Sequence, residues 1–178
     1  TELLPNPRVR YRTPGTRIDL GGIAKGYAID RGIALLKEAG IKHAWLSLGG
    51  DSYVLGDHRG RPWEVGIQHP RNQEKVAMRL PISDLAMSTS GDYQRYFIRD
   101  GRRIHHILSP QTGKSIDGLA SVTVLADNSL DADALSTSVF VLGVEKGLAL
   151  INRLADTSAI IIDRNGNVFY SDDLTTPE

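Results

Sequence analysis

The sequence predicts a mixed α+β domain in which a largely antiparallel sheet packs against helices. The middle third holds several short segments that alternate apolar and polar residues between turn residues, which is typical of antiparallel strands. Longer stretches with apolar residues near helical spacing lie on both sides of that third and predict the helices. A length of 178 residues fits one compact domain.

The amino-terminal part predicts an extended lead-in followed by a strand, a glycine pair and a helix. Residues 1–16 are rich in proline and arginine, which favours the extended lead-in. We expect a short strand over 17–20, ended by Gly21-Gly22. Residues 23–39 predict a helix, because their apolar side chains recur near helical spacing and Gly40 suits a left-handed cap.

The rest of the main domain, expected over 17–170, combines strands with two further helices. The pair Asp100-Gly101 predicts a tight hairpin turn. Expected strands span 43–48, 53–55, 63–68, 75–80, 85–88, 93–98, 103–108, 121–126, 159–162 and 168–170. Helices are expected over 132–143, with an acidic front edge, and over 144–154, and residues 171–178 form a polar tail.

Composition excludes several classes of function. The chain carries 21 basic and 21 acidic side chains, and this zero net charge argues against a nucleic-acid partner. The absence of cysteine excludes disulfides, thiolate metal sites and cysteine nucleophiles. No run approaches the roughly 18 apolar residues of a membrane span, and the first ten residues lack a signal-peptide pattern. The chain opens on Thr1 rather than methionine, so an earlier segment could have been removed.

The glycine pair could form a phosphate-binding turn. Glycines between a strand and a helix let the backbone approach a ligand and point free N–H groups at it. Lys25, in the first helical turn, adds a point charge suited to a phosphate. The alternative interpretation is an ordinary tight turn followed by a surface lysine.

Asp133 and Thr137 could hold a cation. They lie four residues apart on an expected helix, so a carboxylate and a hydroxyl project from one face. Oxygen ligands suit a hard ion such as Mg²⁺. Alternatively, Asp133 only complements the positive helix N-terminus, while Thr137 bonds back to a carbonyl.

One of two adjacent histidines could act as a general base. His105 and His106 follow each other in an expected strand, so they face opposite sides of the sheet. Imidazole titrates near neutral pH, which suits proton transfer. The alternative is one packing histidine beside an exposed one. A Ser-His-Asp hydrolase fits poorly, because no serine lies in a Gly-x-Ser-x-Gly elbow.

Taken in order, six sequence blocks resemble one family. They are DLGGIAKGYAID at 19–30, LGGD at 48–51, STSGDY at 88–93, HHIL at 105–108, TG at 112–113 and ADALST at 132–137. They are similar to the FAD:protein FMN transferase (ApbE) family, formerly called thiamine biosynthesis lipoproteins. The resemblance covers about residues 17–170, and six ordered blocks are far more specific than any one of them.

The resemblance implies a Mg²⁺-dependent flavin transferase with an ApbE-like fold. Such an enzyme uses FAD as substrate, cleaves its pyrophosphate, attaches FMN to a threonine of an acceptor flavoprotein and releases AMP. Family members are commonly lipid-anchored on the periplasmic side of the inner membrane. They also carry a further segment of roughly a hundred or more residues, about a domain in length, before the first block. That segment, with any anchor, has no counterpart in this chain.

The resemblance also implies roles for individual residues. The metal ligands would be the Asp133 and Thr137 side chains and the Gly22 backbone carbonyl, and His106 would be the base for the acceptor threonine. The FAD contacts would be Asp19, Lys25 and Ile107.

The sequence departs from the family pattern after the histidines. A Ser-Pro pair at 109–110 replaces the usual Asp-Pro pair, and Gln111 stands where a basic residue is usual. We expect these changes to alter the stability of the loop or a substrate contact.

Two other functions remain open at this point. An FAD pyrophosphatase would use the same metal but let water replace the threonine, giving FMN and AMP. A flavin-binding module without turnover would hold FAD and release no AMP.

Overall fold

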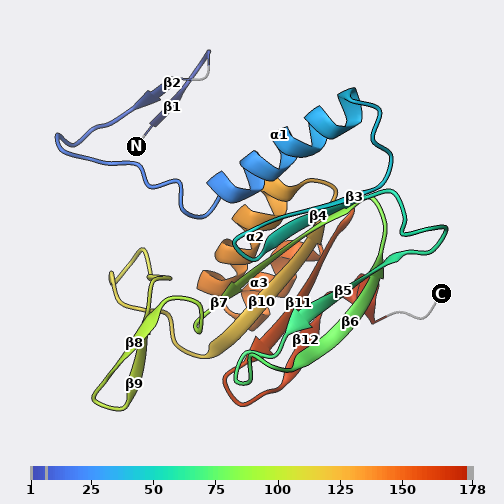
Figure 1. Cartoon of the computed structure of the whole chain (residues 1–178). Helices are drawn as coiled ribbons and strands as arrows, with labels where there is room; N and C mark the ends of the chain where they lie inside the picture. Colours follow the sequence, from blue (N-terminus) through green and yellow to red (C-terminus); the bar gives the residue numbers. More distant parts are fainter. Residues whose placement is uncertain (1, 7, 176–178) are drawn as a thin grey trace.

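The computed structural model describes residues 2–6 and 8–175 and confirms the α+β class. Its centre is a six-stranded antiparallel sheet (Figure 1). In spatial order the strands are β12 (Val168–Tyr170), β11 (Thr157–Asp163), β10 (Leu119–Ala126), β7 (Leu85–Gly91), β4 (Asp51–Leu55) and β3 (Ala44–Leu48). The strand expected over 53–55 is part of β4, which is an antiparallel neighbour of β3.

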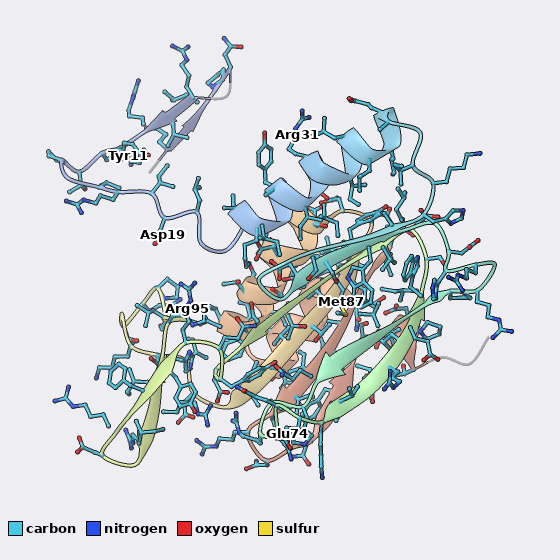
Figure 2. The ribbon with its side chains drawn as sticks, viewed as in Figure 1. Tyr11, Asp19, Arg31, Glu74, Met87 and Arg95 are labelled. Carbon is cyan, nitrogen blue, oxygen red and sulfur yellow. The ribbon has the colours of Figure 1, made fainter. Side chains whose placement is uncertain are left out.

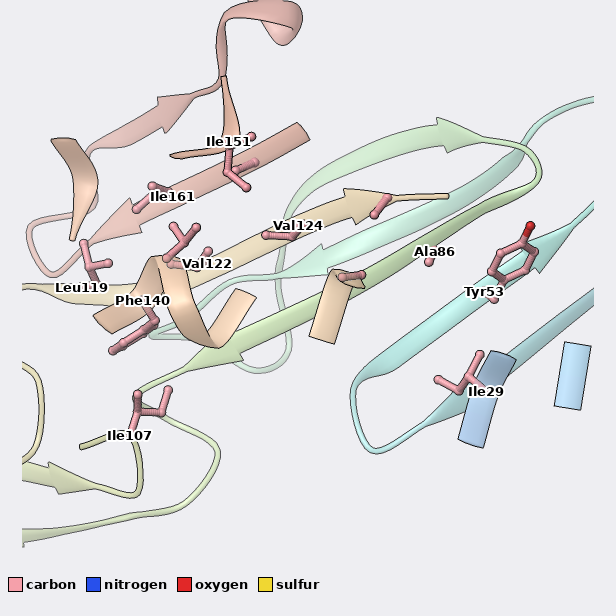
Figure 3. Close-up of a cluster of buried hydrophobic side chains, with 14 of the residues drawn as sticks. Ile29, Tyr53, Ala86, Ile107, Leu119, Val122, Val124, Phe140, Ile151 and Ile161 are labelled. Atoms are coloured by element: carbon pink, nitrogen blue, oxygen red, sulfur yellow. The ribbon is translucent and has the colours of Figure 1, made fainter. Parts of the chain in front are cut away.

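Both faces of the sheet are covered. Three helices, α1 (Ala24–Glu38), α2 (Ser129–Leu142) and α3 (Val144–Ile151), pack against one face, with Phe140 fully buried among them (Figure 3). A hairpin of β5 (Trp63–Gln68) and β6 (Val76–Ile82) covers the other face through a second apolar cluster that includes Val65 and Ile67. Strand β10 is consequently buried along its whole length. Each large apolar side chain buried this way stabilises the fold by about 1.5–3 kcal/mol.

Two smaller hairpins lie apart from the main sheet (Figure 1). The lead-in folds partly into β1 (Glu2–Leu4) and β2 (Arg8–Arg10). The second hairpin joins β8 (Tyr96–Arg99) to β9 (Arg102–His105). Its turn residues Asp100 and Gly101 have φ of 50° and 72°, the left-handed pair that a type I′ turn requires. The Asp-Gly prediction is confirmed.

The structure corrects several of the expected elements. The strands expected over 93–98 and 103–108 are shorter and lie at 96–99 and 102–105, and the helix expected over 144–154 ends at Ile151. The strand predicted over 17–20 is wrong, because that segment is irregular and exposed and pairs with no strand. The Leu20 carbonyl instead accepts hydrogen bonds from the N–H groups of Ile23 and Ala24, so the segment leads directly into α1. Helix α2 begins at Ser129 rather than 132, since the Asn128 side chain accepts the Asp131 N–H as an N-cap.

The carboxyl-terminal end closes the main sheet at β12. A short 3₁₀ helix, η1 (Asp172–Leu174), follows within the expected polar tail, of which residues 176–178 lie outside the described residues. In the part of the chain that the structure describes, no helix is long and apolar enough to cross a membrane.

Candidate functional site

A cavity of about 900 Å³ opens where α1, α2 and the β3–β4 turn meet. Its size lies in the range of small-ligand sites. Figure 2 shows two of its lining residues, Asp19 and Arg95, on the same side of the molecule, one before α1 and the other before β8. All seven residues implied by the resemblance line this cavity: Asp19, Gly22, Lys25, His106, Ile107, Asp133 and Thr137.

The close approach of α1 to α2 brings the floor of the cavity together. A Cβ on Gly26 would lie 2.1 Å from the Ser129 carbonyl oxygen, so only glycine permits this packing. One turn later, the Asp30 carboxylate accepts the N–H groups of Ser129 and Leu130, at 2.7 and 2.9 Å. Asp30 thus caps the neighbouring helix and satisfies two of its free donors. The two helix starts are held side by side.

Lys25 joins two buried carboxylates on this floor. Its Nζ lies 2.6 Å from Asp51 Oδ2 and 2.9 Å from Asp133 Oδ1, and both acidic side chains are 2% exposed. The Gly26 N–H donates to the other oxygen of Asp133. Burial tends to lower the pKa of Lys25, but the hydrogen bonds and charges of the two carboxylates outweigh it and raise that pKa. The lysine is therefore a fixed positive charge.

The pKa of Asp51 is raised, chiefly because the carboxyl is buried, although hydrogen bonds from Lys25 and Ser88 oppose the shift. Asp51 depends on those partners to remain ionised inside the protein. No sequence pattern assigns a role to Asp51, because the contacts of its carboxylate form only when α1, β4 and β7 are packed together.

A chain of hydroxyl groups runs from Asp51 to Thr137. Ser88 Oγ donates to Asp51 at 2.7 Å and lies 3.1 Å from Ser136 Oγ. Ser90 Oγ lies 2.9 Å from Ser136 Oγ and 3.1 Å from Thr137 Oγ1. The three serines are a part of the site that the sequence interpretation missed. Ser88 and Ser90 lie two residues apart, so both side chains lie on one face of β7. This spacing is the sequence signal that could have indicated these two serines.

The residues present fit a hard cation. A Cβ on Gly22 would lie 3.5 Å from Thr137 Oγ1, so the glycine turn sits directly beside this hydroxyl. Thr137 follows Asp133 by one helical turn, which gives an oxygen-only set of donors. No group of three or more His, Asp or Glu side chains that could hold a metal occurs among the described residues. Mg²⁺ sites with few protein ligands are typically completed by substrate phosphates.

The two histidines have different surroundings, as expected for opposite faces. His105 is buried, with Nε2 2.7 Å from the Ile116 carbonyl oxygen and its ring edge-on to Phe140. His106 lies one residue beyond β9 and lines the cavity. Partial burial lowers the pKa of His106, assisted by nearby positive charges and opposed by a hydrogen bond to the Arg95 carbonyl. The ring is therefore neutral at pH 7.

The other two implied contacts have defined local structure. The Asp19 carboxylate accepts the Gly21 N–H at 2.7 Å and so shapes the turn before α1. Ile107 is buried in the main apolar cluster and also lines the cavity. In the loop that departs from the family pattern, Ser109 Oγ accepts the N–H groups of Gln111 and Thr112, both at 3.3 Å. The serine thus makes the turn contacts available to an aspartate at this position.

The sequence matches known proteins over most of its length. Residues 2–162 match the model of the ApbE family. The chain is 40% identical over 165 residues to a FAD:protein FMN transferase of Klebsiella pneumoniae (strain 342), covering 92% of this chain and 51% of the relative. It is 39% identical to a FAD:protein FMN transferase of Rhodobacter capsulatus, covering 96% of this chain and 32% of the relative.

Solved structures have the same fold. The ApbE protein of Thermotoga maritima superposes with a TM-score of 0.82 at 37% identity, over 91% of this chain and 53% of that one. The apo form of the Pseudomonas stutzeri flavinyl transferase ApbE gives a TM-score of 0.75 at 39% identity, over 89% of this chain and 50% of that one. The chain therefore spans about half the length of these structures and of the Klebsiella relative, and about a third of the Rhodobacter relative.

Proposed function

The chain belongs to the ApbE family, and from this premise we propose that it transfers flavin covalently to protein. In the proposed reaction FAD is cleaved at its pyrophosphate, FMN is attached to a threonine of an acceptor flavoprotein, and AMP leaves. The observation that carries this proposal is the convergence of Lys25, Asp133, Thr137 and His106 on one cavity. The named activity of relatives with 36–40% identity supports it.

We propose that Asp133, Thr137 and the Gly22 carbonyl hold Mg²⁺. When bound there, the ion would neutralise charge on the phosphates of FAD. The buried Asp133 carboxylate is already fixed by Lys25 and the Gly26 N–H, and Thr137 by Ser90. These contacts keep the donor oxygens in place at little further entropic cost.

Lys25 and His106 supply the remaining chemistry from the chain itself. An ammonium group has three donors, and the two carboxylates occupy two of those on Lys25. The third can donate to a phosphate oxygen as charge develops on the leaving group. His106, neutral at pH 7, accepts the threonine proton while the threonine oxygen bonds to the FMN phosphorus and the bond to the AMP phosphate breaks.

The reaction test uses the chain with FAD, Mg²⁺ and a threonine-bearing acceptor domain. Covalent FMN, seen as flavin fluorescence on a denaturing gel together with AMP in equal amount, is the expected result. FMN and AMP free in solution, without a labelled acceptor, would assign an FAD pyrophosphatase instead. FAD that stays bound and intact would indicate a flavin-binding module.

The cellular location is a separate proposal. Because family members are commonly lipid-anchored, we propose that the whole protein acts on the periplasmic side of the inner membrane. Fractionation of cells that express the complete gene, with and without its first codons, would test this location.

A further inference from the structure

The β8–β9 hairpin displays apolar side chains that the rest of the protein leaves uncovered. Every residue of β8 is exposed, and Phe97 and Ile98 are 58% and 60% exposed. The hairpin projects from the body of the molecule (Figure 1), and β8 and β9 pair only with each other. Phe97 and Ile98 follow each other in the strand, so one lies on each face of the hairpin, and Tyr96 shares the face of Ile98. Both faces of this projecting element therefore carry exposed apolar side chains, which marks the hairpin as a candidate interaction site.

The same hairpin is basic although the chain as a whole is neutral. Residues 95–103 contain four arginines and a single aspartate, Asp100. Arg99 lies 3.9 Å from Asp100, but both side chains are largely exposed, so the pair is weak. Among the described residues, Arg95 and Arg102 have no acidic partner within salt-bridge distance. The hairpin therefore presents positive charge beside apolar surface.

The base of the hairpin is firmly attached. The Asp92 carboxylate is 8% exposed and accepts two hydrogen bonds from Arg71, at 2.6 and 2.9 Å. Arg103 of β9 lies 3.7 Å from the same carboxylate, and its guanidinium stacks 4.0 Å above the Tyr96 ring. Asp92 thus ties β9 to the β5–β6 turn. The exposed residues are presented on a fixed support, which lowers the entropic cost of binding.

The hairpin also leads directly into the cavity. His106 follows the last residue of β9, and its N–H donates to the Arg95 carbonyl at 3.3 Å. Both Arg95 and His106 line the cavity. A protein segment seated on the hairpin would therefore lie next to the proposed general base.

We propose that the β8–β9 hairpin is the docking surface for the acceptor flavoprotein, and that the docked segment carries acidic and apolar side chains around its threonine. This inference rests on the proposed function, since only a transferase needs a protein acceptor at this place. A second copy of the chain would bring the same positive hairpin and be repelled in a two-fold contact. Charge complementarity instead favours an acidic partner, whose approach it would also accelerate.

Direct binding tests the proposal without requiring turnover. The probe is a fluorescent 15-residue peptide with one threonine among leucines and aspartates, and its counterpart has lysine at each aspartate. By fluorescence anisotropy at low salt, we expect the acidic peptide to bind ~10-fold tighter or more, and to lose this advantage at high salt. Equal affinity for the two peptides would overturn the proposal.

Variants locate the binding surface. R99E/R102E should weaken binding of the acidic peptide ~10-fold or more, whereas K146E/R153E, an equal charge change on and after α3, should leave it within ~2-fold. F97S/I98S should weaken it without changing the charge. If R99E/R102E binds the acidic peptide like the wild type, the hairpin is not the docking surface. If neither peptide binds, and if the wild type but not R99E/R102E binds anionic lipid vesicles, the hairpin is a membrane contact instead.

The activity readout separates this inference from the proposed function. Because neither Arg99 nor Arg102 is among the residues that line the cavity, R99E/R102E should bind FAD as tightly as the wild type and transfer FMN with an unchanged kcat, yet with a raised KM for the acceptor. A wild-type chain that releases no AMP when FAD, Mg²⁺ and the acceptor are all present would contradict the proposed function, while the peptide affinities would still decide the docking surface.

Discussion

The floor of the cavity and the β8–β9 hairpin are built in opposite ways. On the floor, two helices meet without room for a Cβ at Gly26, and a half-buried lysine forms ion pairs with two buried carboxylates. The hairpin is set by a two-residue turn and attached through Asp92, and most of its surface is exposed. Changes on the floor should therefore cost stability and chemistry together, whereas changes on the hairpin should affect recognition alone.

Gly26→Ala should have the largest effect. The added methyl group would overlap the Ser129 carbonyl, so α1 and α2 must separate, at a cost of about 3 kcal/mol. Separation would also pull Lys25 from Asp133 and abolish AMP release. Urea unfolding measures the loss of stability. The control, Ala28→Gly on the exposed face of α1, should cost only about 1 kcal/mol through helix propensity. Equal losses for both variants would contradict the close-approach argument.

Lys25→Met should come next. It leaves two buried carboxylates without their cation, and because the lysine is about a third exposed we expect a loss of about 2–3 kcal/mol rather than the full value for a buried pair. Adding Asp51→Asn to this variant removes one of the uncompensated charges and should restore part of the stability but no activity. A double variant less stable than Lys25→Met would show that the charge of Asp51 is not the cause.

Asp92→Asn should have an intermediate effect that distinguishes the attachment of the hairpin from its exposed surface. The amide loses the charge-assisted pair with Arg71, at a cost of about 1–2 kcal/mol. Hydrogen exchange of the β8 and β9 amides should accelerate. Phe97→Ser, at an exposed position of β8, should change the free energy of unfolding by less than about 0.5 kcal/mol. A loss of stability in Phe97→Ser as large as that of Asp92→Asn would mean that Phe97 is packed rather than exposed.

The smallest effect concerns His106. The pKa of His106 lies below the ordinary value of 6.5, mainly because of burial. The imidazole therefore remains a neutral base until the pH falls below this depressed pKa. Transfer should accordingly lose rate only as the pH drops through the depressed pKa. NMR titration of the ring measures this pKa directly. Arg95→Gln removes a neighbouring positive charge and should raise it slightly, whereas Lys146→Gln should not. A pKa above 6.5 would contradict the proposed environment.

Local sequence patterns determined much of the fold. Apolar spacing and Gly40 placed α1 within one residue at each end, and Asp100-Gly101 placed the β8–β9 turn, because caps and left-handed turns depend on few neighbouring residues. The strand expected over 17–20 is wrong, because strands do not depend on neighbouring residues alone. A strand needs a partner, and no local pattern supplies one.

The sequence by itself also determined which residues belong together, since all seven residues that the ordered blocks indicated lie among those that line the cavity. Only the tertiary structure decided how they are arranged. Lys25 and Asp133 are 108 positions apart, and their ion pair exists because Gly26 and Asp30 dock α1 onto α2. The roles of Asp51 and the serine chain likewise arise from packing. Local patterns encode turns and periodicity, whereas contacts between distant residues depend on the burial that the whole fold achieves.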